Sequence, residues 1–113
     1  MTWGFVFGLV LIYGVFWAIR RARQTTPAQA HLLVDTGALL LDVRTKAEFE
    51  AGHLPGAVNL PLPTLTADPA AVGEKTRPVV VYCASGTRSA VASTVLRRNG
   101  FVQVADLGSM SRW

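Results

Sequence analysis

The 113-residue sequence contains one cysteine and two histidines. A single cysteine excludes a disulfide within the chain, and Cys83, His31 and His53 do not have the spacing of metal ligands. The sequence also shows no internal repeat and no low-complexity tract. We therefore expect neither a disulfide scaffold nor a metal site, and no cofactor is indicated.

Charge is missing from the start of the chain. No charged residue occurs from Met1 to Ile19, and residues 3–19 read WGFVFGLVLIYGVFWAI, apolar or glycine throughout. A membrane-spanning helix needs about 20 such residues, with a minimum near 17. The stretch is just long enough, so residues 1–23 are predicted to form one N-terminal transmembrane helix with a basic end.

The basic end consists of Arg20, Arg21 and Arg23. A cleavable signal peptide carries its basic residues before the apolar stretch, and here the order is reversed. Arginines near a membrane boundary stay on the cytoplasmic side. This predicts a single-pass protein of the inner (plasma) membrane with residues 24–113 in the cytoplasm. An unusual signal peptide and a helix buried in a larger complex are the alternatives.

The excess of basic residues is concentrated at this predicted boundary. The net charge is +4, and three of the eleven basic residues belong to the arginine cluster. The remaining chain has no dense Lys/Arg face with interleaved aromatics, so a nucleic acid is not an expected partner. The cluster suits anionic lipid headgroups instead.

Two glycines near the start of the chain raise the question of self-association. Gly4 and Gly8 form a GxxxG spacing, which can bring two membrane helices into close contact. Glycine is also common in membrane helices that make no such contact. A weak homodimer and a spacing without function are therefore both open interpretations.

Strands and helices alternate through the rest of the chain. Thr26 before Pro27 is typical of a helix start, and Thr45 with Glu48 has the spacing of a capping box. Such alternation predicts an α/β domain over residues 24–113, with a mostly parallel sheet flanked by helices. The expected strands are 39–43, 57–60, 79–82 and 101–105, and the expected helices begin after 26 and span 45–51 and 89–99, with short helical turns within 62–75.

Cys83 follows the apolar run VVVY and begins the turn CASGTRS. It is thus placed at the carboxyl end of a strand and before a helix, where ligands bind in open α/β sheets. Backbone N–H groups from Ala84 to Arg88 can surround an anion, and Gly86 can adopt a positive φ. The small side chains of Ala84 and Ser85 would leave the sulfur accessible. An inert buried cysteine is the alternative, but this position favours a nucleophilic thiolate that meets an anionic partner.

Four segments then resemble the rhodanese-like family of sulfurtransferases, in the order and spacing of that family, across residues 26–113. The F-x-x-x-H-[LIV]-P-G-A pattern is the most specific part of the resemblance. The segments are LLDVR (40–44), EFEAGHLPGAVNLP (48–61), CASGTRS (83–89) and LGSMSRW (107–113).

The resemblance implies a persulfide cycle centred on Cys83. This cysteine would take a sulfur atom from thiosulfate or a similar small anionic donor and pass it to cyanide or a cellular thiol. The N–H groups of residues 84–88 would bind the anionic sulfur, so the implied substrate-binding residues are Ala84, Ser85, Gly86, Thr87 and Arg88. No second cysteine can resolve the persulfide, so the acceptor thiol must be external.

The other matched residues are expected to support the site. Asp42 and Arg44 would form a polar frame at the active edge, with direct contact to the substrate as the alternative, and Arg44 is expected to pair with Glu48. Ser89 occupies the place where the loop of a C-x5-R cysteine phosphatase has its arginine, so we expect no phosphatase activity. Because rhodanese-like domains are not always enzymes, the alternative function is a non-catalytic docking or regulatory module at the membrane.

Overall fold

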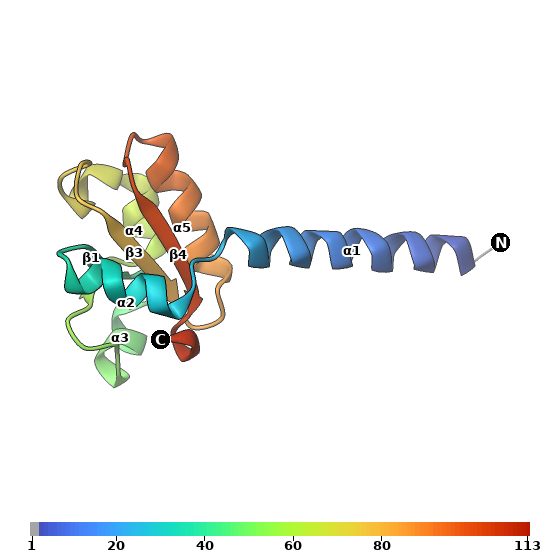
Figure 1. Ribbon diagram of the computed structural model, residues 1–113, viewed down its shortest axis with the longest axis horizontal. Helices are drawn as coiled ribbons and strands as arrows, with labels where there is room; N and C mark the ends of the chain where they lie inside the picture. Colours follow the sequence, from blue (N-terminus) through green and yellow to red (C-terminus); the bar gives the residue numbers. More distant parts are fainter. Residues whose placement is uncertain (1–2) are drawn as a thin grey trace.

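A parallel four-stranded sheet forms the centre of the domain, with the strand order β2-β1-β3-β4 (Figure 1). This computed structural model describes the backbone of residues 3–113 and the side chains of residues 6–16, 18 and 23–113. The strands are β1 (Leu39–Asp42), β2 (Val58–Asn59), β3 (Val79–Cys83) and β4 (Val104–Ser109). The helices are α1 (Trp3–Arg23), α2 (Pro27–Asp35), α3 (Lys46–Ala51), α4 (Leu62–Ala67) and α5 (Thr87–Arg98), with 3-10 turns η1 (Pro69–Val72) and η2 (Met110–Arg112).

The sheet separates two apolar layers, and β3 contributes to both. Alternate residues of a strand point to opposite faces. Val79, Val81 and Cys83 join the cluster that includes residues of α4 and α5, whereas Val80 and Tyr82 join the cluster that includes residues of α2. All five residues of β3 are buried. The parallel α/β fold is therefore as predicted, and Cys83 lies on the α5 side of its central strand.

Local capping explains where two of the helices begin. The side chain of Thr26 accepts a hydrogen bond from the backbone N–H of Gln29, with Pro27 as the first residue of α2. Thr45 and Glu48 form a complete capping box at the start of α3. Both predicted helix starts are confirmed. Such caps satisfy N–H groups that have no partner within the first turn of a helix.

The last strand was predicted too early in the chain. Phe101 is buried, but its N–H donates to Leu96 and completes the turn after α5, so pairing with β3 begins only at Val104. β4 then continues through Gly108, where the register with β3 shifts. Gly108 has φ +84, and its N–H donates to the carboxylate of Asp106. This irregularity carries the strand four residues beyond the predicted end at 105, to Ser109.

α1 projects from the domain and ends at Arg23, where the helix was expected to end (Figure 1). Among the residues that the structure describes, no helix is both long enough and apolar enough to cross a membrane. The predicted transmembrane helix is therefore not supported. Arginines occupy three of the last four positions of α1, which leaves 17 residues before them, at the lower limit of about 17 for a span.

The predicted contact of two helices through Gly4 and Gly8 concerns the first half of α1. Met1 and Thr2 lie outside the described residues, and nothing is described around Gly4. A Cβ added at Gly8 would meet no atom within 4 Å. The contact of two helices through Gly4 and Gly8 stays a prediction.

The segment after α1 is joined to the edge of the sheet. Gln24 forms a parallel bridge with Asp106, and the N–H of Thr25 donates to the carbonyl of Asp106 at 2.7 Å. Arg112 donates to Gln24, to Thr25 and to the carbonyl of Leu107. These bonds fix the base of α1 against β4 and the carboxyl end of the described chain.

Candidate active site

Cys83 is the last residue of β3, and the loop after it folds back over the sulfur. The N–H of Gly86 donates to Sγ of Cys83 at 2.9 Å. Gly86 has φ +98 and is the N-cap residue of α5, so the predicted positive φ is confirmed. Ser89 reinforces the turn, because its hydroxyl donates to the carbonyl of Gly86 at 3.1 Å. The loop therefore aims a backbone N–H at the cysteine.

The predicted accessibility of the sulfur is not observed. Ala84 and Ser85 are small and exposed as expected, yet Cys83 itself is completely buried. The sulfur is buried because the side chain of Cys83 packs in the core cluster that includes Ala92 and Leu96 of α5. A reactant must approach through the loop, where the residues on either side of buried Gly86 are exposed.

The start of α5 adds to the environment of the sulfur. The first N–H groups of an α-helix have no partner within the helix, and the helix dipole places partial positive charge there. α5 has twelve residues and begins at Thr87, four positions after Cys83. The loop and the helix start together suit a site for an anion.

Arg88 is bound to Glu48 of α3. Its Nη1 and Nη2 donate to the two carboxylate oxygens of Glu48 at 2.6 and 3.0 Å. The hydrogen bond from Arg88, followed by the backbone N–H of Thr45, lowers the pKa of Glu48 to about 2, and Glu48 in turn raises the pKa of Arg88. Both side chains are about one-third exposed. Arg88 is thus neutralised at the rim of the loop.

The predicted pairing of Arg44 with Glu48 is wrong. Arg44 instead binds Asp42, with Nη2 at 2.8 Å and Nε at 3.1 Å from the carboxylate oxygens. Both residues are buried, and the hydrogen bond to Asp42 is the main cause that raises the pKa of Arg44. Arg44 also donates to the carbonyl of Gly52 at 2.6 Å. A buried charge requires such a partner, and Asp42 supplies it. The role of this pair as a frame of the active edge stays a prediction.

Tyr82 is a buried polar residue that the sequence analysis did not single out. Its hydroxyl accepts the N–H of Leu54 at 3.2 Å, which ties β3 to the turn before β2. Burial, followed by hydrogen bonding with Asp42, raises the pKa of Tyr82 to about 12. Tyr82 precedes Cys83 in β3, and the two side chains lie on opposite faces of the sheet. The bond to Leu54 therefore holds the end of β3 from the face opposite to Cys83.

Ser109 is a second residue that was missed. Its hydroxyl donates to the carbonyl of Ala84 at 2.7 Å, and so the end of β4 holds the first residue of the loop. The predicted strand stopped at 105, four residues before it. The segment LGSMSRW was matched to a family pattern, but only the extended register of β4 shows what this serine contacts.

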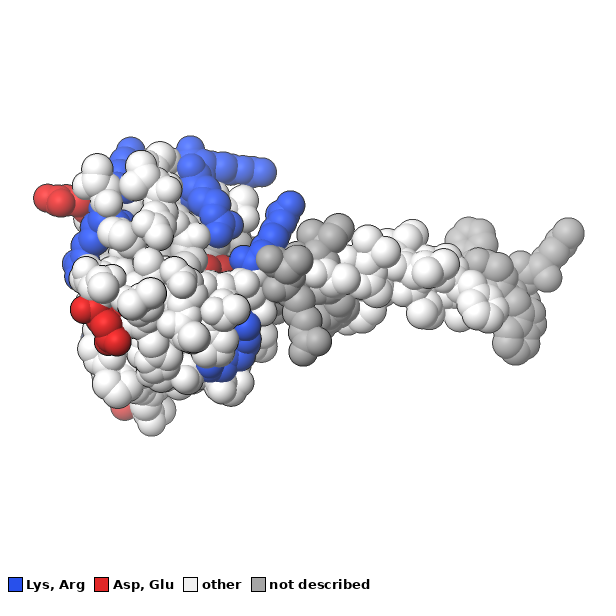
Figure 2. Space-filling model, viewed as in Figure 1, with Lys and Arg blue, Asp and Glu red and all other residues white. Residues whose placement is uncertain are grey.

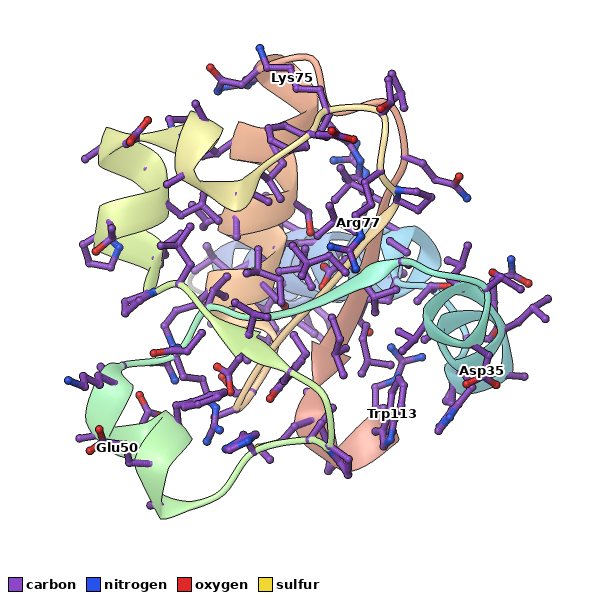
Figure 3. All side chains as sticks on the ribbon, turned by 90° about the vertical axis from the view of Figure 1, so that its left-hand side faces the viewer. Asp35, Glu50, Lys75, Arg77 and Trp113 are labelled. Carbon is purple, nitrogen blue, oxygen red and sulfur yellow. The ribbon has the colours of Figure 1, made fainter. Side chains whose placement is uncertain are left out.

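The two histidines have structural contacts. His53 stacks on Phe49 with ring centroids 3.8 Å apart, and its Nδ1 lies 2.9 Å from the carbonyl oxygen of Phe49. His31 stacks on Trp113 at 3.6 Å, and Figure 3 shows Trp113 beside α2. Neither contact involves a residue of the turn after Cys83.

Comparison with known proteins agrees with this geometry. Residues 26–113 match the family described as the rhodanese-like domain. The chain belongs to this family.

Three relatives illustrate the similarity. The chain is 34% identical over 92 residues to the thiosulfate sulfurtransferase GlpE of Pseudomonas savastanoi pv. phaseolicola, covering 80% of this chain and 86% of that protein. It is 39% identical over 77 residues to the uncharacterized protein YqhL of Bacillus subtilis, covering 67% of this chain. The human single-domain sulfurtransferase TSTD1 superposes with a TM-score of 0.68 at 27% identity, covering 80% and 94% of the two chains.

The similarity to some relatives is limited to part of their length. The chain spans 60% of the Bacillus protein and between 12% and 22% of longer relatives that carry tRNA-related names. The similarity therefore does not extend to the activities and partners of those whole proteins.

Proposed function

We propose that this chain is a sulfurtransferase that carries sulfur as a persulfide on Cys83. The donor is thiosulfate or a similar small anion, and the acceptor is cyanide or an external thiol. The observation that carries the proposal is the hydrogen bond from the N–H of Gly86 to Sγ at the start of α5. A backbone donor fixed in this way stabilises negative charge on sulfur without any movement during the reaction.

The chemistry needs no other redox partner. The thiolate of Cys83 attacks the outer sulfur of thiosulfate, the S–S bond of thiosulfate breaks, and sulfite leaves with the bonding electron pair. Cyanide then attacks the outer sulfur of the persulfide. The bond to the cysteine sulfur breaks, thiocyanate leaves, and the thiolate is restored. Nucleophilic catalysis of this kind divides one transfer into two displacements.

The test is to load the full chain with thiosulfate and follow both halves of the cycle. We expect an adduct of about 32 Da, the mass of one sulfur atom, and thiocyanate when cyanide is added. Cys83→Ser keeps a similar shape but cannot form a persulfide, so it should give neither. An unmodified, inactive wild type or an active serine variant would contradict the proposal.

The second candidate is a docking or regulatory module without activity. Two observations favour this candidate. Cys83 is completely buried, so a reactant does not reach its sulfur directly, and the charge of Arg88 is neutralised by Glu48, so it attracts an anionic donor less strongly. The loading experiment separates the two candidates, because a docking module forms no adduct. The named sulfurtransferases among the relatives favour the enzyme.

Placement at the cytoplasmic side of the inner membrane, with lipid contact through residues 1–23, is a further proposal. It is supported by the absence of charge from Met1 to Ile19, the arginines that follow, and the large apolar side chains of α1 that are more than half exposed. Fractionation of cells that express the full chain tests it. Full recovery with the membranes, and loss of that recovery on deletion of residues 1–23, is expected; recovery without the membranes contradicts it.

A further inference from the structure

A hollow of about 260 Å3 lies between the base of α1 and the outer face of α5. Its described lining comes from three elements, α1, α5 and β4. Sites for drug-sized molecules usually measure about 300–1,000 Å3, so this space lies just below that range and fits a smaller ligand. The lining residues are Phe16, Arg23, Thr87, Ala90, Val91, Thr94, Arg97 and Asp106.

The wall on α5 begins at the cysteine loop. Thr87, Ala90, Val91 and Thr94 have the spacing of one helix face, whereas Ala92 and Leu96 face the core. Thr87 is also the first residue of α5 and part of the loop that holds Cys83. From Thr87 to Arg97 the wall is about 15 Å long, at a rise of about 1.5 Å per residue. The hollow therefore runs from the loop toward Arg97.

The character of the wall changes along this length. Phe16, Ala90 and Val91 make an apolar middle. Arg23 and Arg97 both line the hollow, and within the described residues neither has a carboxylate at ion-pair distance. Arg97 donates to the carbonyl of Val104 at 2.8 Å, which leaves its charge uncompensated by that contact. Figure 2 shows basic side chains around the junction of α1 with the domain.

Asp106 is the acidic residue of the lining. It is 4% exposed, and its carboxylate already accepts the N–H of Gly108 at 2.9 Å. Little of its surface can meet a ligand. With Arg23 and Arg97 against Asp106, the charged side chains of the described lining sum to +1, which favours an anionic group.

We propose that this hollow binds the sulfur acceptor, a small elongated thiol with an apolar stem and a terminal carboxylate. The proposal rests on the sulfurtransferase function proposed above. The thiol end lies over the loop near Thr87, the stem lies against Val91, and the carboxylate meets Arg23 and Arg97. The thiolate attacks the outer sulfur of the Cys83 persulfide, the S–S bond to the cysteine breaks, and the proton of the persulfide leaves with the product persulfide as the cysteine thiolate is restored.

The test compares two acceptors that differ only at one end, 8-mercaptooctanoate and 8-mercaptooctanol, with cyanide as a third. Cyanide is too small to need the hollow. Arg97→Gln should raise the KM for mercaptooctanoate by about two- to fivefold, the effect of one exposed ion pair, and leave the KM values for mercaptooctanol and cyanide unchanged. Arg98→Gln is the matched control, because it removes the same charge at the next position, which does not line the hollow.

Two further measurements test the position of the stem. Octanoate should compete with mercaptooctanoate but not with cyanide, and Val91→Trp should fill the hollow and remove that competition. Persulfide loading from thiosulfate is measured first for every variant. Failure to load wild type contradicts the proposed function, whereas normal loading without a preference for the carboxylate contradicts only the acceptor site.

Other occupants predict different results. If octanoate and octanol compete equally, the hollow is an apolar docking surface and the proposal is wrong. If sedimentation shows a dimer that Val91→Trp dissociates, a second copy of the chain occupies it, and the proposal is again wrong. Competition by octanoate alone, from a monomer, together with the selective effect of Arg97→Gln, supports it.

Discussion

Glu48 and Arg88 lie 40 residues apart in sequence and are joined by two hydrogen bonds, of 2.6 and 3.0 Å. The same carboxylate accepts the backbone N–H of Thr45 and completes the capping box of α3. One side chain therefore caps α3 and holds Arg88 at the start of α5. We regard Glu48 as a positioning residue, because its contacts are with Thr45 and Arg88.

Removal of the charge on Glu48 should make the loop more attractive to anions. In Glu48→Gln the guanidinium of Arg88 is no longer neutralised, so each negative charge of the donor that comes within about 4 Å gains an attraction of about 1 kcal/mol in water. We expect the KM for thiosulfate to fall by about three- to fivefold at low ionic strength. The gain should largely vanish at about 1 M salt, where charges are screened beyond about 3 Å.

A matched control is available on the same helix. Glu50 pairs with Lys46 at 4.0 Å, and Figure 3 shows its side chain at the outer side of α3. Glu50→Gln changes the net charge equally but should leave the KM for thiosulfate unchanged. In Glu48→Gln combined with Arg88→Ala the gain should be absent. An equal effect of both glutamine variants would show that only net charge matters.

The same ion pair predicts how stability depends on pH. The pKa of Glu48 is lowered from 4.5 to about 2, so its contribution to folding is present above 4.5 and is lost as the pH falls through 2. We expect the difference in unfolding free energy between wild type and Glu48→Gln to be constant from neutral pH to about 4.5 and then to shrink. Urea unfolding at several pH values measures it. A difference that already shrinks between neutral pH and 5 would contradict the lowered pKa.

Tyr82 predicts a separate loss of stability at high pH. Its pKa is raised from 10.0 to about 12, mainly by burial, so the unfolded chain loses this proton first. The contribution is complete below 10 and disappears as the pH rises through 12. Tyr82→Phe should remove that dependence and cost about 1–3 kcal/mol at neutral pH, because the N–H of Leu54 is left without its partner. Unchanged alkaline unfolding in the phenylalanine variant would refute this assignment.

Much of the fold follows from local patterns in the sequence. The apolar run at Val79–Tyr82, the capping box of Thr45 and Glu48, and the glycine of the cysteine loop each depend on neighbours within a few residues, and the structure has all three. Such features can be predicted from the sequence because they depend on the local geometry of a few neighbouring residues.

Contacts between distant segments could not be predicted from such local patterns. Glu48 was expected to pair with Arg44, four residues earlier, but it is bound by Arg88, 40 residues later, and Arg44 is bound to the buried Asp42. The strand β4 was ended at 105 because the pattern does not show the irregularity at Gly108, and the contact of Ser109 was lost with it. Each error arose where tertiary structure decided between two local possibilities.

Ser109 provides a test of how the loop is held. Ser109→Ala removes the hydrogen bond to the carbonyl of Ala84, a loss of about 0.5–1.5 kcal/mol in stability. Because the loop then has fewer fixed positions, we expect kcat for sulfur transfer to fall by about two- to tenfold with little change in KM. Ser111→Ala is the control, since Ser111 interacts with Ser109 but, in the described part of the chain, makes no hydrogen bond to the turn after Cys83. Equal losses in both variants would assign the effect to η2 instead.

The position of Arg88 predicts that the chain has no phosphatase activity. Binding of a phosphate ester would require an arginine that is free to close over the phosphate oxygens. Arg88 is instead held by Glu48, and the next position is Ser89, which is buried and donates to the carbonyl of Gly86. We expect the full chain to hydrolyse p-nitrophenyl phosphate no faster than Cys83→Ser does, with the same preparation shown to accept sulfur from thiosulfate. Turnover of the phosphate ester that depends on Cys83 would mean that the loop can reorganise around a tetrahedral anion, and the role given to the ion pair would then be wrong.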